Sequence, residues 1–303
     1  MGKIAFLFPG QGAQKTGMAQ DFYENSPLAR ETFETASRLM GFSMEDLCFT
    51  PNERLDLTEY TQAALLTACT AIWREMDARG MRADVTAGLS LGEYGALIAC
   101  GAMAFSEALP VVRRRGILMQ EAVPVGQGGM AAVMGLANEA IEAVLAGIRD
   151  VQIANYNCPG QTVISGKAEA VEEACAALKE AGAKRCLPLK VSGPFHSSLL
   201  KEAGSKLAEV LAPVALARPV IPYITNVTAE YVTESAPVKS LLERQVSHSV
   251  LWQQTMERML SDGVDTFVEI GPGRTLTGFL RKMTKEARLI NVETLEQLEG
   301  LHL

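Results

Sequence analysis

A Gly-x-Ser-x-Gly motif centred on Ser90 places a hydroxyl where it could act as a nucleophile. Serine in this motif lies on a turn too tight for side chains two residues to either side, so its hydroxyl stands clear of the backbone. Residues 93–105 predict an apolar helix, whose N-terminus would face negative charge developing beside the hydroxyl. Residues 84–87 are short for the strand that should precede the turn. Because the motif is common by chance, a role of Ser90 as nucleophile requires a base, an anion hole and a substrate-binding group elsewhere.

A serine hydroxyl becomes an effective nucleophile only when a neighbouring base takes its proton, and histidine is the usual base at neutral pH. The chain has three histidines. His302 is next to last, where chains usually fray, and His248 lies in a polar segment where it could simply be solvated. His196 precedes a predicted helix at the edge of the predicted core. We interpret it as the base, although a helix-capping or core histidine would have the same pattern.

A third group should hold the imidazole of the base in one tautomer. No carboxylate is linked to His196 by a motif. Glu269 ends a predicted strand, Asp262 and Asp265 lie in a polar connection, and each could equally be solvated. The sequence therefore favours an amide or a backbone carbonyl as the orienting group.

The composition excludes several classes of protein. With 303 residues and a net charge of −7, the chain fits one large domain or a large domain with a small insert, and nucleic acid is disfavoured as a partner. Residues 96–105 are too short to span a bilayer, and residues 4–8 are too short for a signal peptide. Six cysteines without a Cys-x-x-Cys pair indicate reduced thiols of a cytoplasmic protein and no metal site. They are Cys48, Cys69, Cys100, Cys158, Cys175 and Cys186.

A glycine-containing loop at residues 9–14 follows the first predicted strand, residues 3–8. Such loops bring backbone amides close to a pyrophosphate in dinucleotide-binding proteins. Here the spacing fails, because Lys15 occupies the position of the third glycine and no acidic residue closes a second strand at the required distance. We expect a turn that presents amides without nucleotide specificity.

The elements that must position Ser90 and His196 alternate between predicted strands and predicted helices. This alternation predicts a largely parallel sheet with helices on both faces. Apolar runs typical of strands buried on both faces occur at residues 3–8 and 266–270, and a further strand is expected at 221–226. The expected helices span residues 21–40 (one or two helices), 58–79, 93–105, 106–122, a segment ending near 211, 238–245, 252–261 and 275–284.

A change of composition at residues 123–129 predicts a domain boundary. The pattern then runs strand, helix, strand, strand, helix, strand, as in ferredoxin-like modules. The predicted fold is α/β: a large α/β-hydrolase-like domain with a mostly parallel sheet, formed by residues 1–125 and 190–303 and carrying the nucleophile and base, plus a small inserted ferredoxin-like domain at residues 126–189. The insert's expected strands are 130–135, 151–157, 161–165 and 184–189, and its helices are 138–148 and 169–181.

Six motifs together resemble malonyl-CoA:acyl carrier protein transacylases, the malonyl-loading enzymes of fatty-acid synthesis. They occur in the order and approximate spacing of that family, and the resemblance covers nearly the whole chain. The motifs are Pro9-Gly10-Gln11-Gly12-Ala13-Gln14, Gly88-Leu89-Ser90-Leu91-Gly92-Glu93-Tyr94, Arg113 to Gly116, Asn155-Tyr156-Asn157 with Pro159-Gly160-Gln161, Gly193 to His196, and Glu269-Ile270-Gly271-Pro272-Gly273.

The resemblance implies a role for each catalytic position. Ser90 matches the nucleophile that becomes malonylated, and His196 matches the base that takes its proton and later returns it to the leaving thiol. Gln245 matches the residue whose carbonyl orients that histidine, which accounts for the missing carboxylate. The backbone amides of Gln11 and Leu91 match the oxyanion hole.

The resemblance also implies substrate-binding residues. Arg115 matches the arginine that grips the free malonyl carboxylate, and a planar guanidinium can hold a carboxylate through two parallel charge-assisted hydrogen bonds. We interpret Arg113 and Arg114 as a solvated helix face. Phe195 matches a bulky residue of malonyl-selective members and would be a wall against a 2-methyl group, although a packed core phenylalanine would have the same pattern. Asn155 falls on a family segment close to the site mouth.

Leu89 departs from the family pattern, which usually has histidine immediately before the nucleophile. Leucine can neither donate a hydrogen bond nor titrate, so any contribution of that histidine is absent or replaced. We expect the pocket beside Ser90 to be more apolar than is usual in the family.

The predicted reaction is a ping-pong transfer of malonyl from malonyl-CoA to the phosphopantetheine thiol of acyl carrier protein through a malonyl-serine intermediate, with no metal or other cofactor. A serine thioesterase or esterase and a carrier-binding module without activity are the alternatives, and a polyketide pathway is an alternative to fatty-acid synthesis. We expect a monomer without membrane association. The candidates for docking the acidic carrier protein are Lys184, Lys190, Arg281, Lys282 and Lys285.

Overall fold

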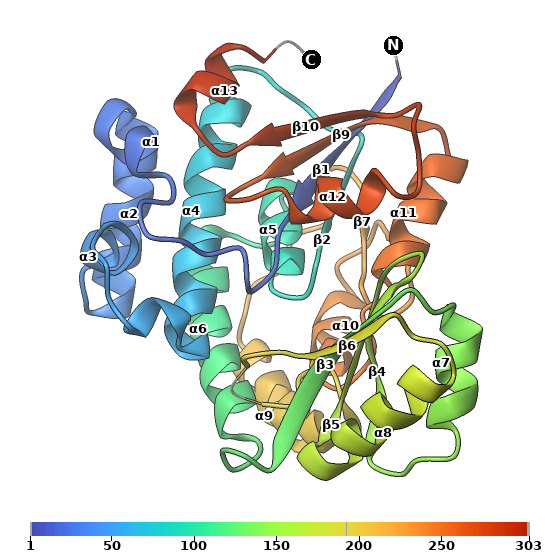
Figure 1. The fold of residues 1–303 in the computed structure, drawn as a ribbon. Helices are drawn as coiled ribbons and strands as arrows, with labels where there is room; N and C mark the ends of the chain where they lie inside the picture. Colours follow the sequence, from blue (N-terminus) through green and yellow to red (C-terminus); the bar gives the residue numbers. More distant parts are fainter. Residues whose placement is uncertain (1, 192, 302–303) are drawn as a thin grey trace.

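A six-stranded, mostly parallel sheet forms the centre of this α/β fold (Figure 1). The computed structural model describes residues 2–191 and 193–301. The strand order is β10-β9-β1-β2-β7-β8, and the neighbours pair in parallel except β7 and β8 at one edge. The strands are β1 (Lys3–Phe8), β2 (Val85–Gly88), β7 (Tyr223–Ile224), β8 (Tyr231–Val232), β9 (Val264–Ile270) and β10 (Arg288–Val292).

Helices cover both faces of this sheet. They are α1 (Gln20–Asn25), α2 (Pro27–Met40), α3 (Met44–Phe49), α4 (Thr58–Ala78), α5 (Gly92–Ala99), α6 (Phe105–Glu121), α9 (Lys201–Leu211), α10 (Val238–Gln245), α11 (Trp252–Ser261), α12 (Thr275–Leu280) and α13 (Leu295–Glu299). Side chains alternate along β1 between two cores: Phe6 and Phe8 belong to the core with α2, α4, α5 and α6, whereas Ala5 and Leu7 belong to the core with α11 and α12. The apolar run of β1 is therefore buried on both faces.

Several predicted boundaries were wrong around the nucleophile and its sheet. The helix expected at 93–105 ends at Ala99, because Gly101 adopts a left-handed φ of 75° and the chain turns before α6 begins. Of the strand expected at 221–226, only Tyr223–Ile224 is paired. The segment that looked short for a strand does form β2, which lies between β1 and β7.

The sequence did not predict α3, β10 or α13. The last core helix, expected at 275–284, ends at Leu280, and the chain then forms β10 at the edge of the sheet beside β9. Only Val292 of β10 is fully buried. An edge strand with half-exposed side chains lacks the continuous apolar run that identifies a central parallel strand.

A second, four-stranded antiparallel sheet lies beside the main one (Figure 1). Its strand order is β4-β5-β3-β6, and it encloses a separate apolar core with α7 and α8. Val250 ties this sheet to the rest of the chain, since its amide donates to the Ala154 carbonyl and its carbonyl accepts from the Tyr156 amide. The elements are β3 (Gly128–Met134), α7 (Asn138–Leu145), β4 (Val151–Cys158), β5 (Gln161–Lys167), α8 (Ala168–Glu180) and β6 (Arg185–Pro188).

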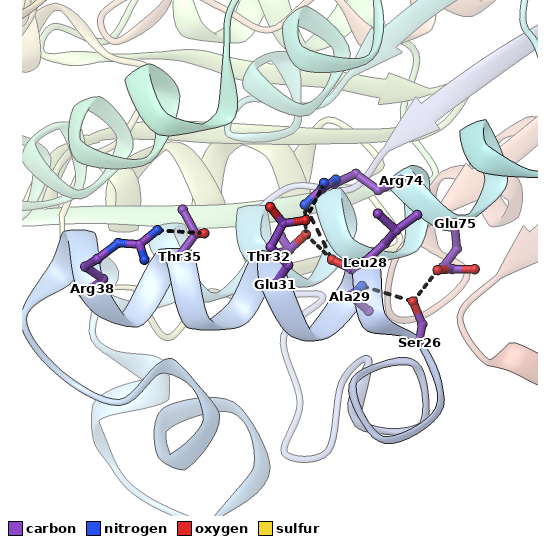
Figure 2. Close-up of polar contacts among 9 residues, drawn as sticks. All are labelled: Ser26, Leu28, Ala29, Glu31, Thr32, Thr35, Arg38, Arg74 and Glu75. Carbon is purple, nitrogen blue, oxygen red and sulfur yellow. Dashed lines mark hydrogen bonds and ion pairs between the residues drawn. The ribbon is translucent and has the colours of Figure 1, made fainter.

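Polar contacts join α2 to α4 (Figure 2). Ser26 caps α2, because its hydroxyl accepts a backbone amide of the first turn, and it also donates to the Glu75 carboxylate on α4. Arg74 of α4 donates to Thr32 Oγ1 and to the Glu31 carboxylate, each at 2.9 Å. These contacts hold the outer helices against α4, which packs in the core on the sheet.

Gly92, the second glycine of the serine motif, lets α5 begin directly against β1. A Cβ at position 92 would overlap the backbone carbonyl of Phe8, and a Cβ at Gly88 would overlap the carbonyl of Gly92. Those backbone atoms lie in the packed centre of the fold and cannot move aside cheaply. The motif therefore requires glycine at both positions for packing as well as for exposure of the hydroxyl.

We predict that Gly92→Ala will destabilise the fold by about 1–3 kcal/mol, the typical cost of overpacking a filled site. Thermal or denaturant unfolding followed by circular dichroism measures the change. Gly278→Ala in α12 is the matched control, because a Cβ there meets no atom within 4 Å and alanine favours helix, so its stability should be unchanged or higher. Equal stabilities for the two variants would contradict the steric argument.

Candidate active site

Ser90 lies on a strained turn between β2 and α5. Its φ of 54° is in the left-handed region, which costs a non-glycine residue about 1–3 kcal/mol unless its surroundings impose it. Asn226 supports the turn from the loop after β7: its Oδ1 accepts from the Ser90 amide at 2.6 Å, and its Nδ2 donates to the Gly88 carbonyl at 2.7 Å. The sequence analysis missed Asn226, because only the pairing of β2 with β7 brings it to a turn 136 residues earlier.

The structure brings His196 and Gln245 to the nucleophile in the arrangement that the resemblance implies. The Ser90 hydroxyl lies 2.7 Å from His196 Nε2. On the other side of the ring, His196 Nδ1 lies 2.8 Å from the backbone carbonyl of Gln245. A carbonyl can only accept, so Nδ1 carries the proton and Nε2 is free to accept the proton of the serine. The backbone carbonyl of Gln245 thus orients the imidazole, as the carboxylate of an acidic residue does in other triads.

Burial, and then the nearby Arg115 guanidinium, lower the pKa of His196 from its usual 6.5 to about 4. Both effects disfavour the imidazolium, the first by desolvation and the second by repulsion. The ring is therefore neutral at physiological pH and can accept a proton.

Gln152 on β4 holds the turn that carries the base. Its Nε2 donates to the His196 carbonyl at 3.2 Å, and its Oε1 accepts from the Ser198 amide at 2.9 Å. His196 itself has a φ of 57°, so the base and the nucleophile both occupy left-handed backbone. No motif pointed to Gln152, whose role depends on the position of the second sheet.

The other titratable candidates lie outside this arrangement. Glu269 is buried, not solvated as the sequence suggested, and its carboxylate accepts from the Leu276 and Thr277 amides at the start of α12. Asp262 accepts from Arg258 at the surface. His248 is exposed and bonds to a backbone carbonyl. Asp265 is exposed and accepts from a neighbouring hydroxyl, and His302 lies outside the described residues.

Arg115 on α6 is a buried cation beside the nucleophile, with 1% of its surface exposed. Its Nη2 donates to Ser90 Oγ and to Gln245 Oε1, each at 3.0 Å, and its Nη1 donates to Gln62 Oε1 at 2.7 Å. All three acceptors are neutral, and burial lowers the pKa of the guanidinium. A buried cation without an ion pair is costly, so the site is suited to receive an anion. Gln62 on α4 was not predicted.

The two arginines before Arg115 differ from each other. Arg114 is exposed, as the sequence suggested. Arg113 is half-buried, stacks on Phe42 and Tyr60 and donates to a backbone carbonyl. It is a packing residue, so its interpretation as part of a solvated face was wrong.

A cavity of about 250 Å³ opens onto the nucleophile. It is lined by every predicted site residue except Gln245, which lies behind the base. Phe195 and Asn155 are 6% and 7% exposed and form parts of its wall. The predicted site residues that line it are Gln11, Ser90, Leu91, Arg115, Asn155, Phe195 and His196.

Gln11 and Leu91 border the nucleophile from the loop after β1 and from the start of α5. Within the described part of the chain, neither backbone amide donates a hydrogen bond. Two unused amides on residues that line the same cavity as Ser90 suit the stabilisation of a developing oxyanion.

Leu89 places an apolar side chain on the cavity wall next to the nucleophile. Leu276 and Phe279 of α12 line the same cavity and share a core cluster with Leu89. The cavity wall is therefore apolar at this position. That the pocket is more apolar than is usual in the family stays a prediction.

The described residues contain no cluster of histidine, cysteine or acidic side chains that could hold a metal. None of their helices has the length and apolarity needed to cross a membrane. The geometry is that of an acyl-transfer site with a serine nucleophile.

Comparisons with known proteins agree with this chemistry. A family model described as an acyl transferase domain matches residues 5–297. A malonyl CoA-acyl carrier protein transacylase of Bacillus subtilis is 44% identical over 99% of this chain and 96% of its own length. The enzyme of the same name from Salmonella typhimurium is 42% identical over 93% of each chain.

Solved structures agree as well. An acyl carrier protein S-malonyltransferase from Vibrio cholerae superposes with a TM-score of 0.96 at 41% identity and covers 99% of this chain and 100% of its own. A second structure, a malonyl-transacylase in complex with its type II PKS acyl-carrier protein, has a TM-score of 0.94 at 41% identity over 98% of each chain. The chain therefore belongs to the acyl transferase family that includes the malonyl CoA-acyl carrier protein transacylases.

Proposed function

We propose that this chain transfers a malonyl group from malonyl-CoA to the phosphopantetheine thiol of acyl carrier protein. The observation that carries the proposal is Arg115, a buried cation hydrogen-bonded to the hydroxyl of the nucleophile. A carboxylated acyl group on Ser90 would bring an anion to that cation, whereas a plain acyl group would leave it unpaired. The names of the relatives and of the carrier-protein complex support the same reaction.

The first half-reaction loads the serine. His196 Nε2 takes the Ser90 proton as Oγ attacks the thioester carbonyl of malonyl-CoA. The amides of Gln11 and Leu91 stabilise the oxyanion of the tetrahedral intermediate. When the intermediate collapses, the carbon–sulfur bond breaks, CoA leaves with the proton from His196, and malonyl-Ser90 remains.

The second half-reaction reverses these steps with a different thiol. The phosphopantetheine thiol gives its proton to the neutral His196 and attacks the Ser90 ester at the same carbonyl. The ester oxygen then leaves and takes the proton back, so malonyl is now on the carrier and the hydroxyl is restored. His196 is neutral at the start and at the end of each half-reaction, and its lowered pKa favours this neutral form.

In this proposal, Arg115 and Phe195 determine which acyl groups the pocket accepts. Arg115 would exchange its bond to Ser90 Oγ for two bonds to the malonyl carboxylate. Phe195 would exclude a 2-methyl branch, and Asn155 would contact substrate near the mouth; both line the cavity.

We also propose that residues 1–125 and 190–303 form an α/β-hydrolase-like domain and residues 126–189 a ferredoxin-like insert. The element order of the insert and its β4-β5-β3-β6 strand order support this division. Through Gln152 and Asn155, the insert would support the base and form part of the pocket wall. The acidic carrier would dock on exposed basic residues, for which the candidates are Lys184, Lys190, Arg281, Lys282 and Lys285.

Labelled malonyl-CoA distinguishes transfer from hydrolysis. We expect label to accumulate on the protein and to move to added carrier protein, and Ser90→Ala to abolish both events because it removes the nucleophile. Ser205→Ala, which alters an exposed serine of α9, should leave both unchanged. Release of free malonate without protein-bound label would favour a thioesterase, and full transfer by Ser90→Ala would rule out the mechanism.

Arg115→Ala should depress malonyl transfer far more than acetyl transfer, because only malonyl has a carboxylate to bind. Loss of a charge-assisted contact of about 2–3 kcal/mol corresponds to a fall of roughly 30- to 150-fold in kcat/KM for malonyl-CoA. Arg114→Ala is the control, since Arg114 is exposed on the same helix. Equal losses with malonyl-CoA and acetyl-CoA would refute a carboxylate-binding role.

The pH dependence of serine acylation should reflect the lowered pKa of His196. Because the imidazole stays neutral until the pH approaches about 4, kcat/KM for the free enzyme should be flat from pH 8 to about 5.5. With acetyl-CoA as substrate, Arg115→Ala should shift the acid limb to higher pH, since it removes the second cause of the lowered pKa. An acid limb centred near 6.5 in the unmodified enzyme would contradict this electrostatic account.

A further inference from the structure

Glu93 is a buried carboxyl one turn from the nucleophile, and the mechanism gives it no part. It lies in the first turn of α5 with 0% of its surface exposed. It forms no ion pair among the described residues. A carboxyl group is expensive to bury, so its presence at this position calls for a physical reason.

The side chain of Gln245 connects Glu93 to Arg115. Gln245 Nε2 donates to Glu93 Oε2 at 2.6 Å, and Gln245 Oε1 accepts from Arg115 Nη2 at 3.0 Å. The two buried groups of opposite charge are thus joined by one amide, with its NH2 toward the carboxyl and its oxygen toward the guanidinium. Glu93 Oε2 also accepts from the backbone amide of Asn226 at 3.1 Å, the residue that holds the nucleophile turn.

A primary amide can flip and exchange its oxygen and nitrogen, and the flipped form would point NH2 at the cation. Two acceptors oppose this flip, because Gln245 Nε2 donates to Glu93 Oε2 at 2.6 Å and to the Ser90 carbonyl at 3.0 Å. The shorter of the two bonds is the one to Glu93. Burial raises the pKa of Glu93 to about 7, so the group is partly protonated near neutral pH. Oε2 can accept in either state, because the other carboxyl oxygen, Oε1, can carry the proton.

We propose that Glu93 is a positioning residue that fixes the Gln245 amide and thereby aims the Arg115 guanidinium at the acyl carboxylate. The inference rests on the proposed carboxylate-binding role of Arg115. Glu93 acts on selectivity through Gln245 and touches neither substrate nor nucleophile. Its effect should therefore depend on the presence of Arg115.

The test is the ratio of kcat/KM for Ser90 acylation by malonyl-CoA to that by acetyl-CoA. Both substrates are measured on the same sample, so a misfolded fraction cancels from the ratio. Glu93→Leu removes the acceptor, and the ratio should fall about tenfold or more, as expected for one misplaced hydrogen bond to a charged group. Glu93→Gln keeps an oxygen that Asn226 and Gln245 can reach, so the ratio should stay within about threefold of the unmodified enzyme.

A double-mutant cycle separates positioning from a structural role. In an Arg115→Ala background, Glu93→Leu should leave the ratio unchanged within about twofold, because the group that it positions is gone. The proposal would be overturned if Glu93→Leu lowered the ratio equally with and without Arg115. It would also be overturned if Glu93→Leu left the ratio unchanged, or if Glu93→Gln lowered the ratio as much as Glu93→Leu. If Arg115→Ala alone leaves the ratio unchanged, the carboxylate-binding role fails and the inference fails with it. If Arg115→Ala lowers the ratio but the Glu93 variants do not give the ratios expected above, the proposal for Glu93 fails and the carboxylate-binding role of Arg115 stands.

Discussion

The buried guanidinium of Arg115 is the constraint on which the rest of the site depends. A cation removed from water needs compensation, and the fold supplies three neutral oxygens from α4, from the nucleophile turn and from α10. Neutral acceptors bond both terminal nitrogens of the guanidinium, whereas its buried Nε has no partner among the described residues, and the positive charge is left for an anionic group. Burial, and then the same charge, lower the pKa of His196, so the imidazole stays neutral. In the proposed mechanism, one buried residue therefore links acyl selectivity to proton transfer.

Gln245 connects these parts. Its backbone carbonyl orients His196, its side-chain oxygen accepts from Arg115, and its side-chain nitrogen donates to the Ser90 carbonyl at 3.0 Å as well as to Glu93. A carboxylate in its place could orient the base but would also neutralise the guanidinium. An amide performs both tasks without adding charge, which suits the proposed binding of a carboxylate in this pocket.

The fold holds the nucleophile and the base in left-handed backbone from opposite sides. Asn226 fixes the Ser90 turn from the main sheet, and Gln152 fixes the His196 turn from the second sheet. Strained residues of this kind persist only when their surroundings impose them. The turn of Ser90 after β2 and Asn155 of β4 both line the cavity. Displacement of either sheet would therefore separate the hydroxyl from the imidazole.

The sequence by itself determined the parts whose signals are local: the glycines around Ser90, the buried run of β1 and the helices at 238–245 and 252–261. Through motif resemblance it also predicted seven of the residues that line the pocket. Only the tertiary structure decided the supports, Asn226, Gln152 and Gln62, because ordinary polar residues acquire such roles from neighbours more than 40 positions away. It also decided that Glu269 caps a helix and that β10 completes the sheet. Local patterns report burial and turns, whereas hydrogen bonds between distant elements depend on how those elements pack.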